Sequence, residues 1–234
     1  MEFTKLSAPS LKELFIQQLE TMILSGRLAV GEKLPTEREL AESLQVSRAV
    51  VNAGIAELAR KGFIIIKPRV GTFVADYRRN GTLETLISIM NYNGGILRRE
   101  EIRSILELRI AMDSLAVELS VPRITDEEIT ILKDYVAQIK EAVSPDEASK
   151  HAFHFQHELA CLSGNTLLPL IFSSFKIPIL SLWERFCRLY GIESLYLNNA
   201  ALCDLIEKRD AKGAVESLSL AINDTISGQR QIYY

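Results

Sequence analysis

The stretch "LPTERELAESLQVSRAVVNAGIAELARKGFIIIKPRVGTFVADY" carries the patterning that most restricts the fold of this chain. Thr36 precedes Glu39 by three residues, which is the capping-box signature of a helix start, and Ser47 is a good N-cap for a second helix. The segments "FIIIK" and "TFVA" have strand composition on either side of the turn-rich "PRVG". Together with a helical pattern over about residues 10–25, the stretch predicts three helices followed by a two-stranded wing.

The helix predicted after Ser47 has two different faces. Val51 and Leu58 belong to an apolar stripe, and the opposite face combines Arg48 and Asn52 with three alanines. Arginine reads guanine edges or binds phosphate, and asparagine can pair with adenine. Small residues allow close approach, and the first-turn N–H groups can bind phosphate. This face predicts a recognition helix in a major groove, although a helical hairpin with a solvated face leaves the same pattern.

Two further observations favour a nucleic-acid partner for the N-terminal part. Arg69 sits at the predicted hairpin tip, between Pro68 and Gly71, where it could reach a minor groove. Residues 1–79 contain 12 Lys and Arg against 9 Asp and Glu, a net charge of +3, whereas residues 80–234 contain 15 against 21, a net charge of −6. The basic excess therefore lies with the predicted winged unit.

The motifs "LPTERELAESLQVSR" and "AGIAELARKGFIIIKPRVGTFV" resemble the winged helix-turn-helix of GntR-family bacterial transcription regulators. The resemblance implies that Arg38, Ser47, Arg48 and Gly71 lie at DNA. The chain departs from the family pattern in two places. Asn52 stands where the family usually has Arg, which implies a changed operator.

Gln45 stands in the turn where the family usually has Gly. If that position requires a positive φ, Gln should cost roughly 1 kcal/mol. Gly54 lies within the same predicted helix, where glycine is mildly unfavourable. Two readings remain open, that it permits close packing or that it only weakens the helix.

The remainder of the chain reads as helix nearly throughout. The expected helices cover about 82–92, 99–121, 126–142, 145–163, 166–190, 193–208 and 211–228. The helix over 166–190 is expected to be kinked by its prolines, and "DYRRNG" is expected to be a polar linker. The predicted fold is mostly α, with a winged helix-turn-helix domain over 1–77 and an all-helical bundle over 78–234.

The second part resembles the FadR-type subfamily through "ELR" at Glu107–Arg109 and "LACLSGN" at Leu159–Asn165. Many of its members bind a divalent metal through one Asp and three His. Here Ala152 and Gln156 replace the first Asp and His, and no His follows His157, so no metal and no cofactor is expected. The resemblance then makes Arg109 and Gln156 the candidate effector-binding residues. Arg109 has an alternative, an intrahelical bridge to Asp113.

The three histidines are concentrated in "HAFHFQH". Glu147, His151, His154 and Glu158 share one helical face, which could bind a metal. A solvated face with Glu–His pairs explains the same spacing.

Composition places the chain in a reducing, non-membrane setting. The three cysteines are scattered and have no metal or redox spacing, as expected of a cytoplasmic protein. The apolar stretch 167–183 is interrupted by Lys176, two prolines and several serines, so it reads as a buried helix and no membrane partner is expected.

These features predict a ligand-responsive transcription regulator and not an enzyme. The expected partners are a double-stranded DNA operator with palindromic symmetry, a second copy of the chain, and a small organic effector, with a carboxylate and an acyl-CoA as candidates. Repression is the default in the family. Two alternatives remain: an enzyme or metal-binding bundle whose wing contacts protein, and a DNA-binding protein without an effector.

Overall fold

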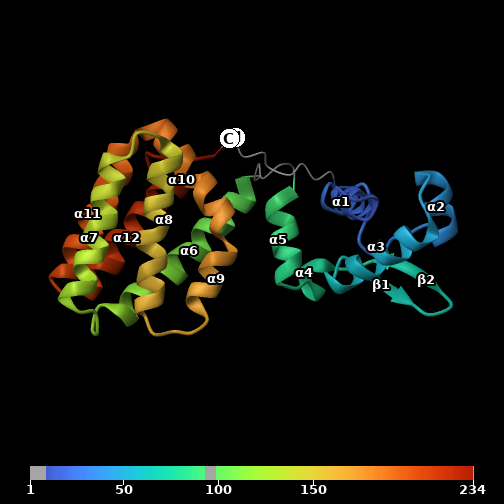
Figure 1. Ribbon diagram of the computed structural model, residues 1–234, viewed down its shortest axis with the longest axis horizontal. Helices are drawn as coiled ribbons and strands as arrows, with labels where there is room; N and C mark the ends of the chain where they lie inside the picture. Colours follow the sequence, from blue (N-terminus) through green and yellow to red (C-terminus); the bar gives the residue numbers. More distant parts are fainter. Residues whose placement is uncertain (1–8, 93–98, 234) are drawn as a thin grey trace, which may run out of the picture. The chain divides into compact units, whose positions relative to one another are not determined.

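The computed structural model describes residues 9–92 and 99–233 (Figure 1). Contacts divide the chain into two compact units, Met1–Ile96 and Leu97–Tyr234. The two-stranded sheet lies in the first unit, and the second unit is helical, so the predicted fold class is confirmed. None of the helices in the described ranges is both long enough and apolar enough to cross a membrane.

The first unit follows the predicted order of three helices and a wing. Its elements are α1 (Leu11–Leu24), α2 (Glu37–Leu44), α3 (Arg48–Arg60), β1 (Ile64–Lys67), β2 (Gly71–Val74), α4 (Tyr77–Asn80) and α5 (Leu83–Asn91). The Oγ1 atom of Thr36 accepts a hydrogen bond from the N–H of Glu39, whose carboxylate accepts one from the N–H of Thr36. The Oγ atom of Ser47 accepts one from the N–H of Val50. Both predicted helix starts are therefore confirmed, and each has its cap.

The wing contains more than the predicted hairpin. β1 and β2 pair antiparallel, with Ile64 opposite Val74 and Lys67 opposite Gly71. The segment before α2 also pairs with β2, because the N–H of Leu34 donates to the carbonyl of Thr72. This additional pairing connects the segment before α2 to the wing. The sequence did not predict it, because this segment has no alternating pattern of apolar and polar residues.

Two backbone positions explain the departures noted in the sequence. Gln45 ends α2 in the left-handed conformation, with φ 53° and ψ 41°, so the expected requirement for positive φ is confirmed. Gly54 faces α1, and an added Cβ would lie 2.2 Å from Cδ1 of Phe15. Gly54 therefore serves close packing of α3 on α1.

α4 and α5 belong by their contacts to the first unit, whereas the sequence placed a domain boundary after Tyr77. The expected linker forms the short helix α4. The hydroxyl of Thr85 in α5 donates to the carbonyl of Lys61, and the ammonium of Lys61 lies 2.8 Å from the carboxylate of Glu20. Ser88 donates to the same carboxylate at 3.0 Å. We call Glu20, Lys61, Thr85 and Ser88 the polar seam.

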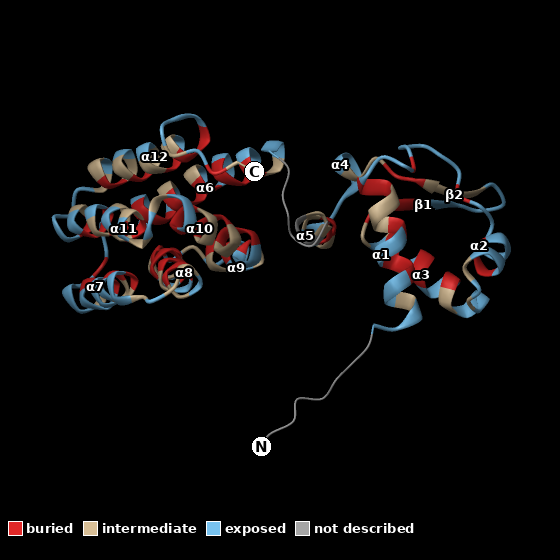
Figure 2. Ribbon diagram, turned by 90° about the horizontal axis from the view of Figure 1, so that it is seen from above, coloured by how far each residue is buried: buried red, intermediate tan, exposed pale blue. Residues whose placement is uncertain are grey.

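The second unit is a bundle of seven helices within the described residues. They are α6 (Arg99–Ser120), α7 (Asp126–Glu141), α8 (Pro145–Leu162), α9 (Leu168–Ser174), α10 (Lys176–Tyr190), α11 (Ile192–Glu207) and α12 (Ala211–Ser227). α6 packs against α12 and α8, and α7 packs against α8 and α11. Their buried residues face one another across the bundle (Figure 2).

The prediction of one kinked helix over 166–190 is wrong, because α9 and α10 are separate helices. They meet at Phe175, with φ −95° and ψ 5°. Pro178 has no N–H to donate to the carbonyl of Ser174, and its ring would clash with that carbonyl in a continuous helix. Ser174 is the last residue of α9, so the break falls where Pro178 requires it.

Replacing Gln45 by glycine should raise the free energy of unfolding by about 0.5–1 kcal/mol, because glycine adopts positive φ without the Cβ penalty. Urea unfolding of the whole chain measures this change. Gln18 is exposed in the middle of α1, so Gln18→Gly is the matched control and should instead lower the free energy of unfolding by about 1 kcal/mol. A loss of stability in Gln45→Gly would contradict the assignment.

Candidate nucleic-acid interface and effector cavity

α3 presents the two faces expected from its sequence. Val51 and Leu58 are buried in the core of the first unit, whereas Arg48 and Asn52 are exposed. Ala49, Ala53 and Ala56 are exposed beside them. The division of faces is confirmed, and contact of the outer face with DNA stays a prediction.

Asn52 makes contacts that the sequence did not reveal. With its amide oriented to satisfy its neighbours, the side chain donates to Oε2 of Glu37 at 2.8 Å and to the carbonyl of Arg48 at 3.1 Å. It thus connects α3 to α2. To pair with adenine, Asn52 would have to release Glu37, so its hydrogen bonds in the free protein oppose base reading.

Arg38 and Arg48 are both available to a phosphate. Arg38 forms one ion pair, with Glu42 at 3.6 Å, and both side chains are about two-thirds exposed, at 67% and 68%. Such an exposed pair contributes little, so the guanidinium can turn to another partner. Within the described ranges, Arg48 has no carboxylate at ion-pair distance. Ser47 uses its hydroxyl as the helix cap, so it offers a partner its backbone and its position rather than a free side chain.

The wing tip holds Arg69 in a constrained turn. The N–H of Val70 donates to the carbonyl of Lys67, and Arg69 has φ 63° at the third position of that turn. Turns with positive φ at this position favour glycine, so an exposed arginine here carries a conformational cost. Gly71 has φ 136°, and a Cβ there would lie 2.6 Å from Cε of Lys33. Gly71 therefore brings the wing close to the segment before α2.

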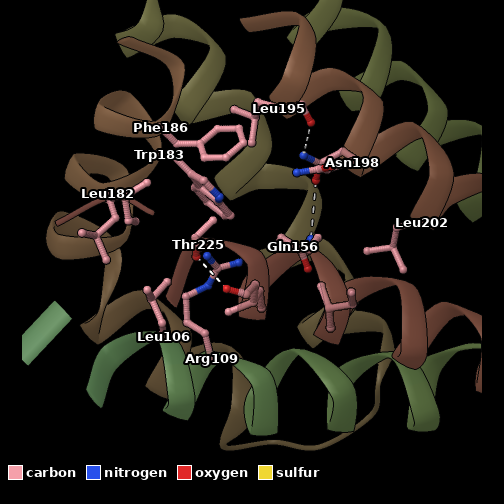
Figure 3. A pocket seen from close by; sticks show the side chains of 15 residues that line it. Leu106, Arg109, Gln156, Leu182, Trp183, Phe186, Leu195, Asn198, Leu202 and Thr225 are labelled. Atoms are coloured by element: carbon pink, nitrogen blue, oxygen red, sulfur yellow. Dashed lines mark hydrogen bonds between the residues drawn. The ribbon is translucent and has the colours of Figure 1, made fainter. Parts of the chain in front are cut away.

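The second unit contains a cavity of about 60 Å³ among α6, α8, α10, α11 and α12 (Figure 3). Its walls are mostly apolar and include Leu182, Trp183 and Phe186. Its polar lining residues are Arg109, Gln156, Asn198, Asn199 and Thr225. Both effector-binding residues expected from the resemblance, Arg109 and Gln156, thus line the same cavity. Their contact with an effector stays a prediction.

Arg109 forms a buried ion pair with Asp113, so the intrahelical bridge is also observed. The Nη2 atom of Arg109 lies 2.8 Å from Oδ2 of Asp113, and the side chains are 5% and 0% exposed. Trp183 covers the guanidinium, with its ring centroid 4.4 Å from Cζ. Burial raises the pKa of Asp113, and the nearby Arg109 opposes that shift.

The pair leaves hydrogen-bonding groups unused. Nε of Arg109 and Oδ1 of Asp113 are buried and have no partner among the described residues. An unsatisfied buried polar group costs about 1–3 kcal/mol, so each such group requires an explanation. A polar molecule in the cavity beside Arg109 would supply a partner to the guanidinium.

Gln156 is held loosely. Its Nε2 atom donates to Oδ1 of Asn199 over 3.5 Å, at the long limit of a hydrogen bond, and Asn199 donates to the carbonyl of Leu195 at 2.8 Å. A ligand acceptor could therefore compete for the amide of Gln156. Sequence reasoning did not propose Asn198, Asn199, Trp183 or Thr225. The adjacent asparagines within an apolar helix were the one signal that could have drawn attention to them.

The face shared by Glu147, His151, His154 and Glu158 was the other candidate metal site. In the described part of the chain, no group of three or more His, Cys, Asp or Glu residues is placed to hold a metal ion. The ring of His154 contacts those of Tyr135 and Phe153. Partial burial lowers the pKa of His154, and the positive charge of nearby Lys176 lowers it further. Glu147 accepts a hydrogen bond from the N–H of Val143.

Family comparisons agree with both units. Residues 11–74 match the model of "Bacterial regulatory proteins, gntR family", and residues 104–224, over half of the chain, match the FCD domain model. The chain belongs to the GntR family, in its FCD-containing, FadR-type branch. It is therefore a transcriptional regulator with a helix-turn-helix domain and an FCD effector-binding domain.

Individual relatives are regulators by name. The chain is 29% identical to the HTH-type transcriptional regulator Mce2R of Mycobacterium tuberculosis, over 71% of this chain and 69% of that protein. It is 27% identical to the HTH-type transcriptional repressor NanR of Cronobacter sakazakii, over 95% of this chain and 86% of that protein. A solved structure described by "Lar controls the expression of the Listeria monocytogenes agr system and mediates virulence" aligns with a TM-score of 0.60 at 13% identity, over 94% of this chain and 96% of that one. That likeness shows the fold alone.

Arg109→Ala should lower the free energy of unfolding by about 3–5 kcal/mol at neutral pH, because it leaves Asp113 buried without its cation. The loss should shrink at mildly acidic pH, since the raised pKa of Asp113 means that the folded state takes up the proton more readily than the unfolded state. Urea unfolding at both pH values measures it.

The matched control lies on the same helix. Arg103 forms an exposed pair with Glu107 at the same spacing, and Arg103→Ala should cost less than about 1 kcal/mol. If both variants lost the same free energy of unfolding, burial of the Arg109–Asp113 pair would not increase its contribution to stability.

Proposed function

We propose that this regulator represses transcription by binding a palindromic operator as a homodimer, and that a small organic effector in the FCD cavity changes its affinity for DNA. The observation that best supports this proposal is the outer face of α3. Arg48 is exposed there and has no carboxylate at ion-pair distance among the described residues. Arg69 on the wing is also exposed, and it too has no carboxylate at ion-pair distance among the described residues. Unpaired arginines on a recognition helix and a wing suit major-groove and minor-groove contacts.

The homodimer follows from the size of the reading unit. One helix and one wing contact few base pairs, so two copies are needed for affinity and for half-site spacing. A twofold dimer matches an operator with twofold symmetry. Repression is favoured because relatives such as NanR are named repressors. Since its target would be chromosomal DNA, we place the regulator in the cytoplasm.

The effector that suits the cavity is a small organic acid. Arg109 offers a cation with an unpartnered Nε, and Gln156 and Asn198 offer amide donors nearby. These groups match a carboxylate, and the apolar walls match a short carbon chain. The volume of about 60 Å³ is small for an acyl-CoA, so we favour the short carboxylate. Residues 152 and 156 are Ala and Gln, so these positions offer no Asp or His ligand to a metal.

An effector acts by binding one arrangement of the dimer more tightly than another. Its differential affinity sets how far the population of DNA-binding dimers moves. Catalysis is not proposed for this chain. Its relatives are named regulators, and among the described residues the buried polar groups of the cavity include no nucleophile paired with a base.

Arg48→Ala should weaken binding to a double-stranded operator, selected by the wild-type protein from a random library, by about 1–3 kcal/mol, which is at least several-fold. Fluorescence anisotropy at fixed salt measures the affinity, and titration at high concentration measures the stoichiometry, expected to be two chains per site. Arg188→Ala is the control, because Arg188 lies on α10 and is exposed. Unchanged affinity in Arg48→Ala would remove α3 from the interface.

Short-chain carboxylates and sugar acids should include at least one that raises the melting temperature of the wild type, by roughly 2–4 °C for each kcal/mol of ligand stabilisation. Acyl-CoA is tested in the same thermal-shift panel. Asn198→Ala should abolish the rise, because this half-buried residue lines the cavity. If nothing in the panel stabilises the wild type, the protein is better described as a DNA-binding regulator without an effector.

A further inference from the structure

The segment after α12 crosses the cavity as an irregular strap. Residues 229–233, which we call the strap, have no helix or strand, and they pass beside α10 (Figure 1, red). Ile232 is 2% exposed, and its side chain lines the cavity together with Trp183 and Phe186. One side of the cavity is therefore closed by a segment outside the helical bundle.

Side chains of α10 hold the strap by its backbone. Nε of Arg185 donates to the carbonyl of Ile232 at 2.7 Å, and the same guanidinium donates to the carbonyl of Tyr233. The hydroxyl of Tyr190 donates to the carbonyl of Gln231 at 2.7 Å. Three consecutive carbonyls are thus bound by two side chains. The N–H of Ile232 donates to the carbonyl of Thr225 over a long 3.4 Å.

The base of the strap is fastened separately. Asp224 lies 2.6 Å from Nε of Arg230 and accepts from the N–H of Gln229 at 2.7 Å. The hydrogen bond from Arg230 is the main cause of a lowered pKa at Asp224, and the bond from the N–H of Gln229 lowers it further. The base would therefore stay in place while residues 231–233 swing away from α10.

We propose that the strap is a lid over the FCD cavity, opened by release of residues 231–233 from Arg185 and Tyr190. The proposal rests on the proposed function, since it assigns to the effector cavity its route of entry. Opening the lid breaks the hydrogen bonds to Arg185 and Tyr190, the contact of the Tyr233 ring with Arg99 and the packing of Ile232. Opening between helices would instead break the packed core. Segments with few apolar contacts open at lower free energy than core helices. Ile232, as the movable part of the wall, also limits the length of ligand that fits with the lid closed.

The single tryptophan allows a test that needs no effector. Trp183 is the one tryptophan of the chain, is 8% exposed, and lines the cavity beside Ile232. Quenching of its fluorescence by acrylamide reports how often the cavity opens to solvent. Arg185→Ala and Tyr190→Phe should each raise the Stern–Volmer constant of the full-length protein, by about twofold or more for Arg185→Ala.

Two controls separate lid opening from general loosening. Arg188→Ala changes an exposed arginine of the same helix and should leave quenching unchanged. Far-UV circular dichroism should show the same helix content in every variant. Tyr190→Phe keeps the ring that packs on Phe186 and removes only the hydroxyl, so it decides the matter if Arg185→Ala does not fold.

Unchanged quenching in folded Tyr190→Phe and Arg185→Ala would overturn the lid. A rise of the same size in Arg188→Ala would also overturn it, because the cavity would then be opening by another route. Failure of the proposed function would look different: the effector panel would give no thermal shift, while the quenching would still respond to Arg185 and Tyr190.

Discussion

The close approach of α3 to α1 at Gly54 determines what the first unit can present to a partner. The ring of Phe15 occupies the space where a side chain at Gly54 would lie. This contact, with buried Val51 and Leu58, fixes the rotation of α3 about its own axis. Once that rotation is fixed, Arg48 and Asn52 have to face outward. The helix-weakening effect of glycine is thus offset by the packing that orients the recognition face.

The second unit depends in a similar way on the buried pair of Arg109 and Asp113. Two charges inside a bundle are tolerated when they are paired and fully hydrogen-bonded, and here the pair is formed but its hydrogen bonding is incomplete. Apolar residues of similar volume would often give a more stable bundle. An incompletely hydrogen-bonded arginine beside a cavity is therefore easier to explain by recognition of an anion than by stability.

Local signals gave most of the fold and only part of the site. Capping residues such as Thr36 and Ser47 fix helix starts through contacts within four residues, so their sequence patterns are reliable. The break at Phe175 was missed because Pro178 acts on a carbonyl one turn earlier, and a proline near the start of a helix is also compatible with a kink. The contact of Asn52 with Glu37, and the placement of Asn198, Thr225 and Arg109 around one cavity, depend on how separate helices pack. No pattern within one helix contains that information.

The polar seam fastens α5 to α1 and to the end of α3. Thr85 and Ser88 connect α5 to Lys61 just beyond the end of α3 and to Glu20 in α1. A rotation of α5 would therefore strain these hydrogen bonds unless α1 and the end of α3 followed it. A movement imposed on α5 would therefore also reorient α3, the helix that carries Arg48 and Asn52.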